Sequence, residues 1–177
     1  MIGAVLCGGA SRRMGVDKAT LQVGGTAMAR RVADALSAAG CSPVVAIGGD
    51  TAALADLGLD VVIDEFPGEG PLGGVLTALS LGSPVMVAAC DLADLGAATV
   101  TRLVAALGDH DASIAFSDRA EPLCAIWSDQ ATPVLRSRFQ AGERAMHRAI
   151  EGLDVAWVDV SAEGLRNVNS PGDLERS

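Results

Sequence analysis

The sequence predicts an α/β fold in three layers, Rossmann-like, with helices on both faces of a mostly parallel central sheet. Short, continuous apolar runs alternate with longer segments of helical periodicity, as is typical of strands that are buried on both faces. The chain has 177 residues, of which 50% are hydrophobic and 20% are charged. This composition is globular, and the length fits a single domain that spans residues 1–177.

The first part of the chain reads as strand and helix in turn. Ile2–Leu6 is a short apolar run that suits a buried strand, and a glycine-rich basic loop follows it. From Thr26 to Ala39 apolar residues recur at helical spacing, and Gly40 can end that helix. The same criteria predict strands at Val44–Ile47 and Val61–Ile63, with a short helix, Thr51–Leu57, between them.

A segment over 66–74 interrupts this alternation, because its two prolines and four glycines exclude a regular element. This loop leads into a helix expected at Leu72–Leu81. Further helices are expected at Ala97–Leu107, Gln130–Phe139 and Glu143–Ile150, and strands at Pro84–Ala89, Ala112–Phe116, Leu123–Trp127 and Val155–Val160. Ser170 and Pro171 have the pattern of a helix start, which predicts a short C-terminal helix.

Charge and cysteine content narrow the classes of function. The net charge is −9 and the isoelectric point is about 4.5, which argues against a nucleic-acid or anionic-membrane partner. No apolar run approaches the roughly 20 residues that a membrane span needs. The four cysteines lie far apart and match neither a zinc knuckle nor a CxxC motif. We therefore expect a cytoplasmic protein with reduced thiols.

The loop from Leu6 to Lys18 is the first candidate for chemistry. It follows a predicted strand, contains Gly8 and Gly9, and concentrates basic residues, including Arg13, in an acidic chain. Glycines let a backbone approach a ligand closely and turn N–H groups toward phosphate oxygens, while Arg and Lys bind phosphate directly. On these grounds alone the loop is either a phosphate-binding loop or a solvated basic loop.

Position in the fold connects this loop to two others. In open α/β sheets the ligand lies at the carboxyl ends of the strands. Asp64 follows the third predicted strand and Asp91 follows the fourth, so both should lie at that edge with the first loop. Both aspartates are also suited to capping a helix or building a turn, which is the purely structural interpretation.

A more specific signal lies in the motifs themselves. The run Leu6-Cys7-Gly8-Gly9 with Ser11, Arg13-Met14-Gly15 and Asp17-Lys18 resembles the signature of the sugar-nucleotide-type nucleotidyltransferases, and it is most similar to that of the molybdenum cofactor guanylyltransferases. Further similar segments are Asp64 with Gly70–Gly74, Cys90-Asp91, Gln140–Arg144 and Asn167–Pro171. They occur in the expected order along almost the whole chain.

The resemblance implies a role for each position. The backbone of Leu6, Cys7 and Gly8, with Gly9, would hold the nucleotide. Lys18 would bind the triphosphate, with Arg13 close enough to help; Asp64 would contact either guanine N–H groups or a ribose hydroxyl; and Asp91 would bind Mg²⁺. Asn167 and Asn169 would lie near the metal and the second substrate, although they also suit a simple turn.

The implied reaction is transfer of GMP from GTP to molybdopterin, with Mg²⁺ as the cofactor and pyrophosphate as the product. Gly8 stands where related cytidylyltransferases have Ala, which favours a purine. Guanylyltransferases often have an Asn near Ile47–Asp50, and this chain has none there.

Two other classes remain open. One is a related nucleotidyltransferase that uses CTP, such as a molybdenum cofactor cytidylyltransferase, or another phosphorylated acceptor. The other is a non-catalytic regulator that binds nucleotide, although such a regulator has no need of a metal-binding carboxylate. The resemblance also leaves room for a partner protein that delivers molybdopterin.

Overall fold

The computed structural model describes residues 1–8 and 18–165, and its centre is a seven-stranded sheet of order β5-β4-β1-β6-β8-β7-β9. The strands are β1 (Ile2–Leu6), β4 (Val44–Ile47), β5 (Asp60–Val62), β6 (Val85–Ala89), β7 (Ala112–Phe116), β8 (Ala120–Trp127) and β9 (Val155–Asp159). Strand β8 runs antiparallel to β6 and β7, and the other neighbouring pairs of the sheet are parallel. The predicted α/β fold with a mostly parallel sheet is confirmed.

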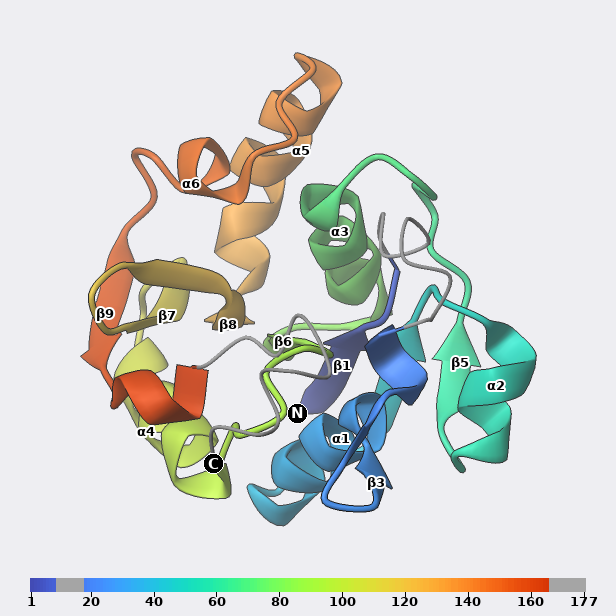
Figure 1. Cartoon of the computed structure of the whole chain (residues 1–177). Coiled ribbons are helices and arrows are strands. Elements are labelled where there is room, and N and C mark those ends of the chain that lie inside the picture. The colour runs from blue at the N-terminus through green and yellow to red at the C-terminus, as the bar shows by residue number, and fades with distance from the viewer. Residues whose placement is uncertain (9–17, 166–177) are drawn as a thin grey trace.

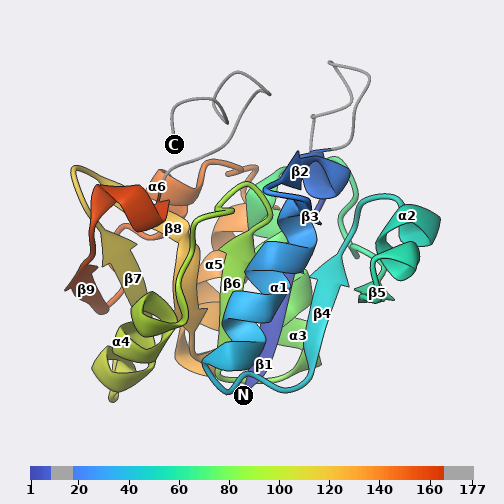
Figure 2. The ribbon, with the colours of Figure 1, turned by 60° about the horizontal axis from the view of Figure 1, so that its bottom comes forward.

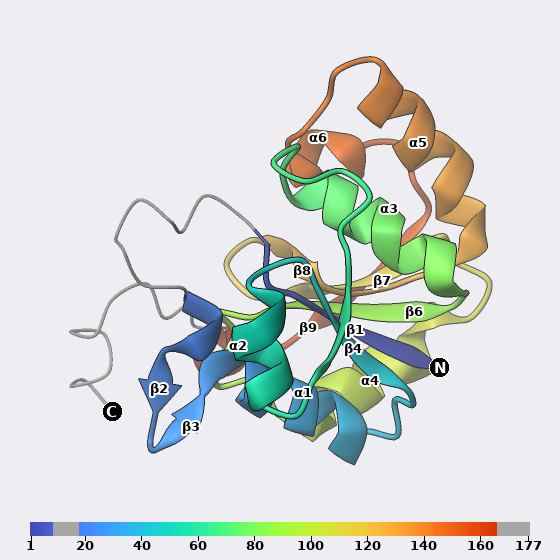
Figure 3. The ribbon, with the colours of Figure 1, turned by 90° about the vertical axis from the view of Figure 1, so that its right-hand side faces the viewer.

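Helices cover both faces of the sheet (Figures 1 and 3). Helices α1 (Met28–Ala38), α2 (Thr51–Asp56) and α4 (Ala97–Leu107) lie on one face, and α3 (Pro71–Leu81), α5 (Thr132–Gln140) and α6 (Met146–Ala149) lie on the other. In the described part of the chain, no helix is long and apolar enough to cross a membrane.

Alternation along each strand divides the apolar side chains between two cores. In β1, Val5 packs into the core beneath α1 and α4, whereas Leu6 packs into the core beneath α3 and α5. Leu36 of α1 and Leu76 of α3 are nearly inaccessible to solvent, so each helix buries its apolar face fully. Two closed cores hold the sheet, and with it the carboxyl ends of the parallel strands, in a fixed arrangement.

Four local expectations were wrong. Residues 71–74, for which a regular element was excluded, form the first turn of α3, where a proline is tolerated. The start of the helix expected at Thr26 instead forms a hairpin of β2 (Gln22–Val23) and β3 (Thr26–Ala27), which turns through two glycines with positive φ. Strand β8 begins three residues earlier than expected. Helix α6 is a single turn, because the residues before it form a loop. The predicted C-terminal helix lies outside the described residues.

Candidate active site

The carboxyl ends of β1, β4, β5 and β6 meet at one edge of the sheet, at the top of Figure 2. Leu6 ends β1 beside Ala89 of β6 and Ile47 of β4. Beyond Leu6, the N–H groups of Cys7 and Gly8 both donate to the carbonyl of Ile47, at 2.9 and 3.2 Å. The Gly8 N–H is thus bonded within the protein instead of facing a phosphate, because the loop continues the pairing of β1 with β4.

Gly8 packs directly against the loop that follows β4. Gly48 and Gly49 have φ values of +69° and +82°, a region that residues with a side chain rarely adopt. A Cβ at Gly48 would lie 3.2 Å from the Cα of Gly8, and a Cβ at Gly49 would lie 3.1 Å from the Cβ of Cys7. The two loops approach each other this closely only because these positions have no side chain.

Asp50 is the last residue of the loop that follows β4. Its carboxylate accepts hydrogen bonds from the N–H groups of Ala52 and Ala53, both at 3.0 Å, and caps α2. Of the three residues Gly48, Gly49 and Asp50, two have no side chain and the third caps a helix. The loop therefore has no amide side chain at the place where guanylyltransferases often have an Asn.

Asp64 lies opposite Gly8, at the end of β5. One carboxylate oxygen, Oδ1, accepts from the N–H of Phe66 at 2.9 Å and lies 3.0 Å from the hydroxyl of Thr77 in α3. The other oxygen, Oδ2, would lie 3.8 Å from a Cβ placed on Gly8. The structure therefore brings Asp64 and Gly8 together, as expected, and holds the carboxylate with one oxygen toward the loop after β1.

Lys18 and Asp91 form an ion pair on the other side of Gly8. The Nζ of Lys18 lies 3.7 Å from Oδ2 of Asp91, and both side chains are about three-quarters buried. Burial raises the pKa of the Asp91 carboxyl, and the nearby positive charge of Lys18 opposes that increase. Lys18 is the first residue of the short 3-10 helix η2 (Lys18–Thr20). The ion pair therefore places the start of η2 beside the segment that follows β6.

A second carboxylate lies near this pair. The negative charge of Glu121 adds to the increase in the Asp91 pKa, so the two groups are close enough to interact. Ala88 pairs with Cys124 in the antiparallel strands β6 and β8. Asp91 comes three residues after Ala88, and Glu121 comes three residues before Cys124, so both lie beyond the same end of this pairing. Glu121 in turn pairs with Arg119 at 2.6 Å. Glu121 was not predicted to be a neighbour of Asp91, because the sequence does not show that β8 runs antiparallel to β6.

Arg31 links the Lys18 segment to the Asp91 segment. From α1, its Nε donates to the carbonyl of Ala93 at 2.9 Å and its Nη1 donates to the carbonyl of Val23 at 3.4 Å. Its Nη2 also lies 3.6 Å from the carboxylate of Asp94. One guanidinium group therefore ties the hairpin after Lys18 to the loop after Asp91, which fixes how the two functional segments face each other.

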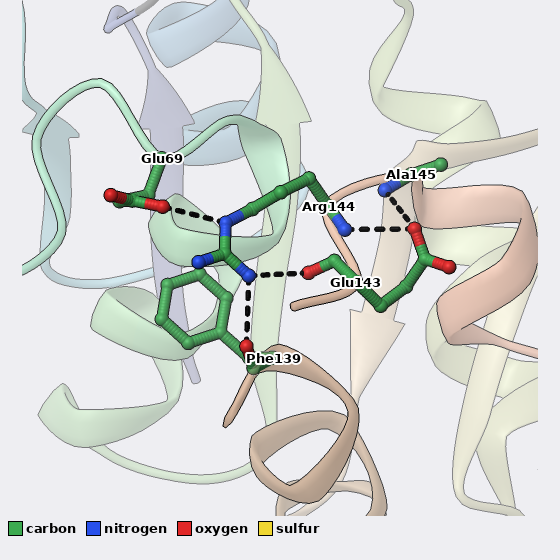
Figure 4. Close-up of polar contacts among 5 residues, drawn as sticks. All are labelled: Glu69, Phe139, Glu143, Arg144 and Ala145. Carbon is green, nitrogen blue, oxygen red and sulfur yellow. Dashed lines mark hydrogen bonds and ion pairs between the residues drawn. The ribbon is translucent and has the colours of Figure 1, made fainter. Parts of the chain in front are cut away.

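Arg144 performs a similar role on the opposite face of the sheet, between α5 and the loop before α3 (Figure 4). Its Nε donates to Glu69 at 2.7 Å, and its Nη1 donates to the carbonyls of Phe139 and Glu143, both at 2.8 Å. The guanidinium also lies 4.0 Å from the centre of the Phe139 ring. These contacts join the Gly70–Gly74 segment to the Gln140–Arg144 segment, two motifs that the sequence keeps far apart.

The remaining expected site residues cannot be placed. Gly9, Arg13, Asn167 and Asn169 lie outside the described residues. Within the described residues there is no cluster of three or more His, Cys, Asp or Glu side chains that could hold a metal ion. Asp91 nevertheless fits Mg²⁺, because this ion often takes one or two carboxylates and completes its shell with phosphate oxygens and water.

Comparison with known proteins identifies the family of the chain. The family model of the MobA-like NTP transferase domain matches residues 3–156. The chain is 34% identical to a molybdenum cofactor guanylyltransferase of Cereibacter sphaeroides, over 100% of this chain and 95% of that protein. It is also 34% identical to a protein of Opitutus terrae named a probable molybdenum cofactor guanylyltransferase, over 99% of this chain and 94% of that protein.

A solved structure gives the same result in three dimensions. The molybdopterin-guanine dinucleotide biosynthesis protein A of Archaeoglobus fulgidus superposes with a TM-score of 0.82 at 26% identity, over 99% of this chain and 96% of that one. Sequence and fold therefore match the same group of proteins along nearly their full length. The chain belongs to the MobA-like NTP transferase family of nucleotidyltransferases.

Proposed function

We propose that this chain transfers GMP from GTP to the terminal phosphate of molybdopterin and releases pyrophosphate. The observation that carries the proposal is the meeting of Gly8, Asp64 and the Lys18–Asp91 pair at one edge of the sheet. These are the positions that the resemblance assigns to the nucleotide and its metal. The choice of guanine as the base and of molybdopterin as the acceptor rests on the relatives named as guanylyltransferases, which align over nearly the whole chain.

The reaction needs no nucleophilic side chain. An oxygen of the molybdopterin phosphate forms a bond to the α-phosphorus of GTP. The bond from that phosphorus to the oxygen that bridges to the β-phosphate breaks, and pyrophosphate leaves with the electron pair. The acceptor phosphate is already anionic, so the protein has to align the two phosphates and neutralise their charge.

Lys18 supplies one part of that neutralisation. Its ammonium group lies at the ligand edge at the start of a short 3-10 helix, where it would bind the phosphates of GTP. Arg13 and Gly9 would add contacts from the same loop, and Asn167 and Asn169 would approach from the second-substrate side. Those four roles rest on the resemblance.

Asp91 would hold a magnesium ion. Its carboxylate is a hard oxygen donor just after β6, and it pairs with Lys18. When bound, magnesium neutralises negative charge on the phosphates that react. Nucleotide binding would draw Lys18 toward the phosphates, which would leave the Asp91 oxygen available to the ion.

A nucleotide panel tests the proposal. The thermal midpoint of the wild-type protein is measured with GTP, CTP, ATP or UTP, each with Mg²⁺, and pyrophosphate release is then measured with molybdopterin. We expect the largest stabilisation with GTP and release that depends on both substrates and on Mg²⁺. Stabilisation by CTP alone would identify a cytidylyltransferase, and GTP binding without release would identify a non-catalytic binder.

A further inference from the structure

Thr77 lies behind the Asp64 carboxylate, away from the nucleotide side. It is 1% exposed, and its Oγ1 lies 3.0 Å from Asp64 Oδ1. The same hydroxyl accepts from the N–H of Glu65 at 3.1 Å and lies 3.0 Å from the carbonyl of Gly73. The hydroxyl has one proton, which it can donate to Asp64 Oδ1 or to the carbonyl of Gly73, and the carboxylate is the stronger acceptor.

The hydroxyl therefore joins α3 to the segment that follows β5. It meets both the side chain of Asp64 and the backbone of the next residue, while the N–H of Phe66 holds the same oxygen, Oδ1, from another direction. Two donors on Oδ1 fix the plane of the carboxylate. The consequence is that Oδ2 is directed toward the loop after β1, where it would lie 3.8 Å from a Cβ on Gly8.

We infer that Thr77 is a positioning residue for guanosine recognition, and this inference rests on the proposed function. Among the described atoms nearest to a Cβ on Gly8, the loop after β4 contributes only glycine backbone, whereas the segment after β5 contributes a carboxylate oxygen, Asp64 Oδ2. A guanosine N–H or ribose hydroxyl would donate to Asp64 Oδ2. Thr77 touches no nucleotide; it sets the direction of the oxygen that does.

The test compares Thr77→Val, which keeps the shape and removes the hydroxyl, with Thr77→Ser, which restores it. We expect the Kd and the KM for GTP to rise about five- to tenfold in Thr77→Val, with kcat at saturating GTP changed by less than about twofold. Thr77→Ser should remain close to wild type. Thr101→Val is the matched control, because Thr101 bonds a carbonyl one turn earlier in α4 and contacts no carboxylate.

A double-mutant cycle shows whether Thr77 acts through Asp64. In an Asp64→Ala background, Thr77→Val should have almost no further effect on the affinity for GTP, because no carboxylate remains to be positioned. Additive losses, or unchanged GTP affinity in Thr77→Val, would overturn the positioning role while leaving the proposed function intact. Failure of the wild-type protein to bind GTP would instead overturn the proposed function. Thermal unfolding of each variant confirms that the affinities refer to folded protein.

Discussion

The ammonium group of Lys18 lies 3.7 Å from the carboxylate of Asp91, so the cation expected on the triphosphate and the anion expected on the metal form an ion pair with each other. Burial favours the neutral form of Asp91, and Lys18 offsets part of that cost. A nucleotide with its metal brings a negative partner for the one and a positive partner for the other. Both charges can then be redistributed within the same partly buried edge.

The first prediction concerns this pair. Lys18→Met and Asp91→Asn should each lower kcat/KM for GTP by about 10²- to 10³-fold, because each removes charge stabilisation at the reacting phosphates. The thermal midpoint should fall moderately, more for Lys18→Met than for Asp91→Asn, because the first variant leaves the largely buried Asp91 carboxylate without its cation. Pyrophosphate release and thermal unfolding measure the two effects.

The control for this pair is Asp129→Asn, because Asp129 is an exposed acid in the 3-10 helix before α5. Wild-type turnover in either variant would remove that residue from the mechanism.

The second prediction concerns the close approach of the two loops. Gly49→Ala should lower the thermal midpoint by about 5–10 °C, because its Cβ would lie 3.1 Å from the Cβ and 3.3 Å from the carbonyl oxygen of Cys7 in the facing loop, in addition to the strain of a positive φ. Gly25→Ala has almost the same φ, +81° against +82°, but no described atom lies within 4 Å of its Cβ. It should lose only about 2–4 °C. Equal losses in the two variants would show that crowding between the loops contributes nothing.

The third prediction is a pH dependence that originates at Glu143. Hydrogen bonds from the N–H groups of Ala145 and Arg144, together with Arg148, lower the pKa of this carboxyl to about 2. Because the folded value lies below the unfolded one, the stabilisation is present above about pH 4.5 and is lost as the pH falls toward 2. Glu143→Gln should therefore be less stable than wild type at pH 7, and the gap should close on acidification. Thermal midpoints from pH 7 to 2 measure this, with exposed Glu151→Gln as the control. A gap of constant size would contradict the assignment.

The fourth prediction concerns Arg144. Arg144→Met removes the ion pair to Glu69 and both carbonyl contacts, so the segment before α3 should open more often. Amide hydrogen exchange over residues 66–70 should accelerate about tenfold, with little change in α1. Arg144→Lys should not restore protection, because an ammonium cannot reproduce the planar fork. Arg30→Met removes a guanidinium that pairs within α1, and it should leave the segment unchanged.

Periodicity predicted the regular part of the fold well. Strands β1, β4 and β7 and helix α4 have the bounds expected from their apolar patterns, because burial on both faces leaves a clear pattern in the sequence. The reversed direction of β8 was missed, since an apolar run does not encode the direction in which a strand enters a sheet. The β2–β3 hairpin was missed because two-residue strands are too short to show alternation.

The sequence likewise predicted some residues of the candidate site and missed others. Position after a strand was enough to bring Gly8, Asp64 and Asp91 to one edge. The residues that support them could not be predicted, because Thr77 and Arg31 lie on helices whose pattern reports burial and not what the polar side chain meets. Glu121 became a neighbour of Asp91 only through the direction of β8.

That reversal also has a consequence for how such enzymes can diversify. Because β8 runs opposite to β6 and β7, the turn at Ser117–Arg119 between β7 and β8 opens at the ligand edge, on the half of the sheet away from β4 and β5. Lengthening this turn would add chain at that half of the ligand edge and leave the loops around Gly8 and Asp64 untouched. The topology thus allows the two halves of the edge to vary independently of each other.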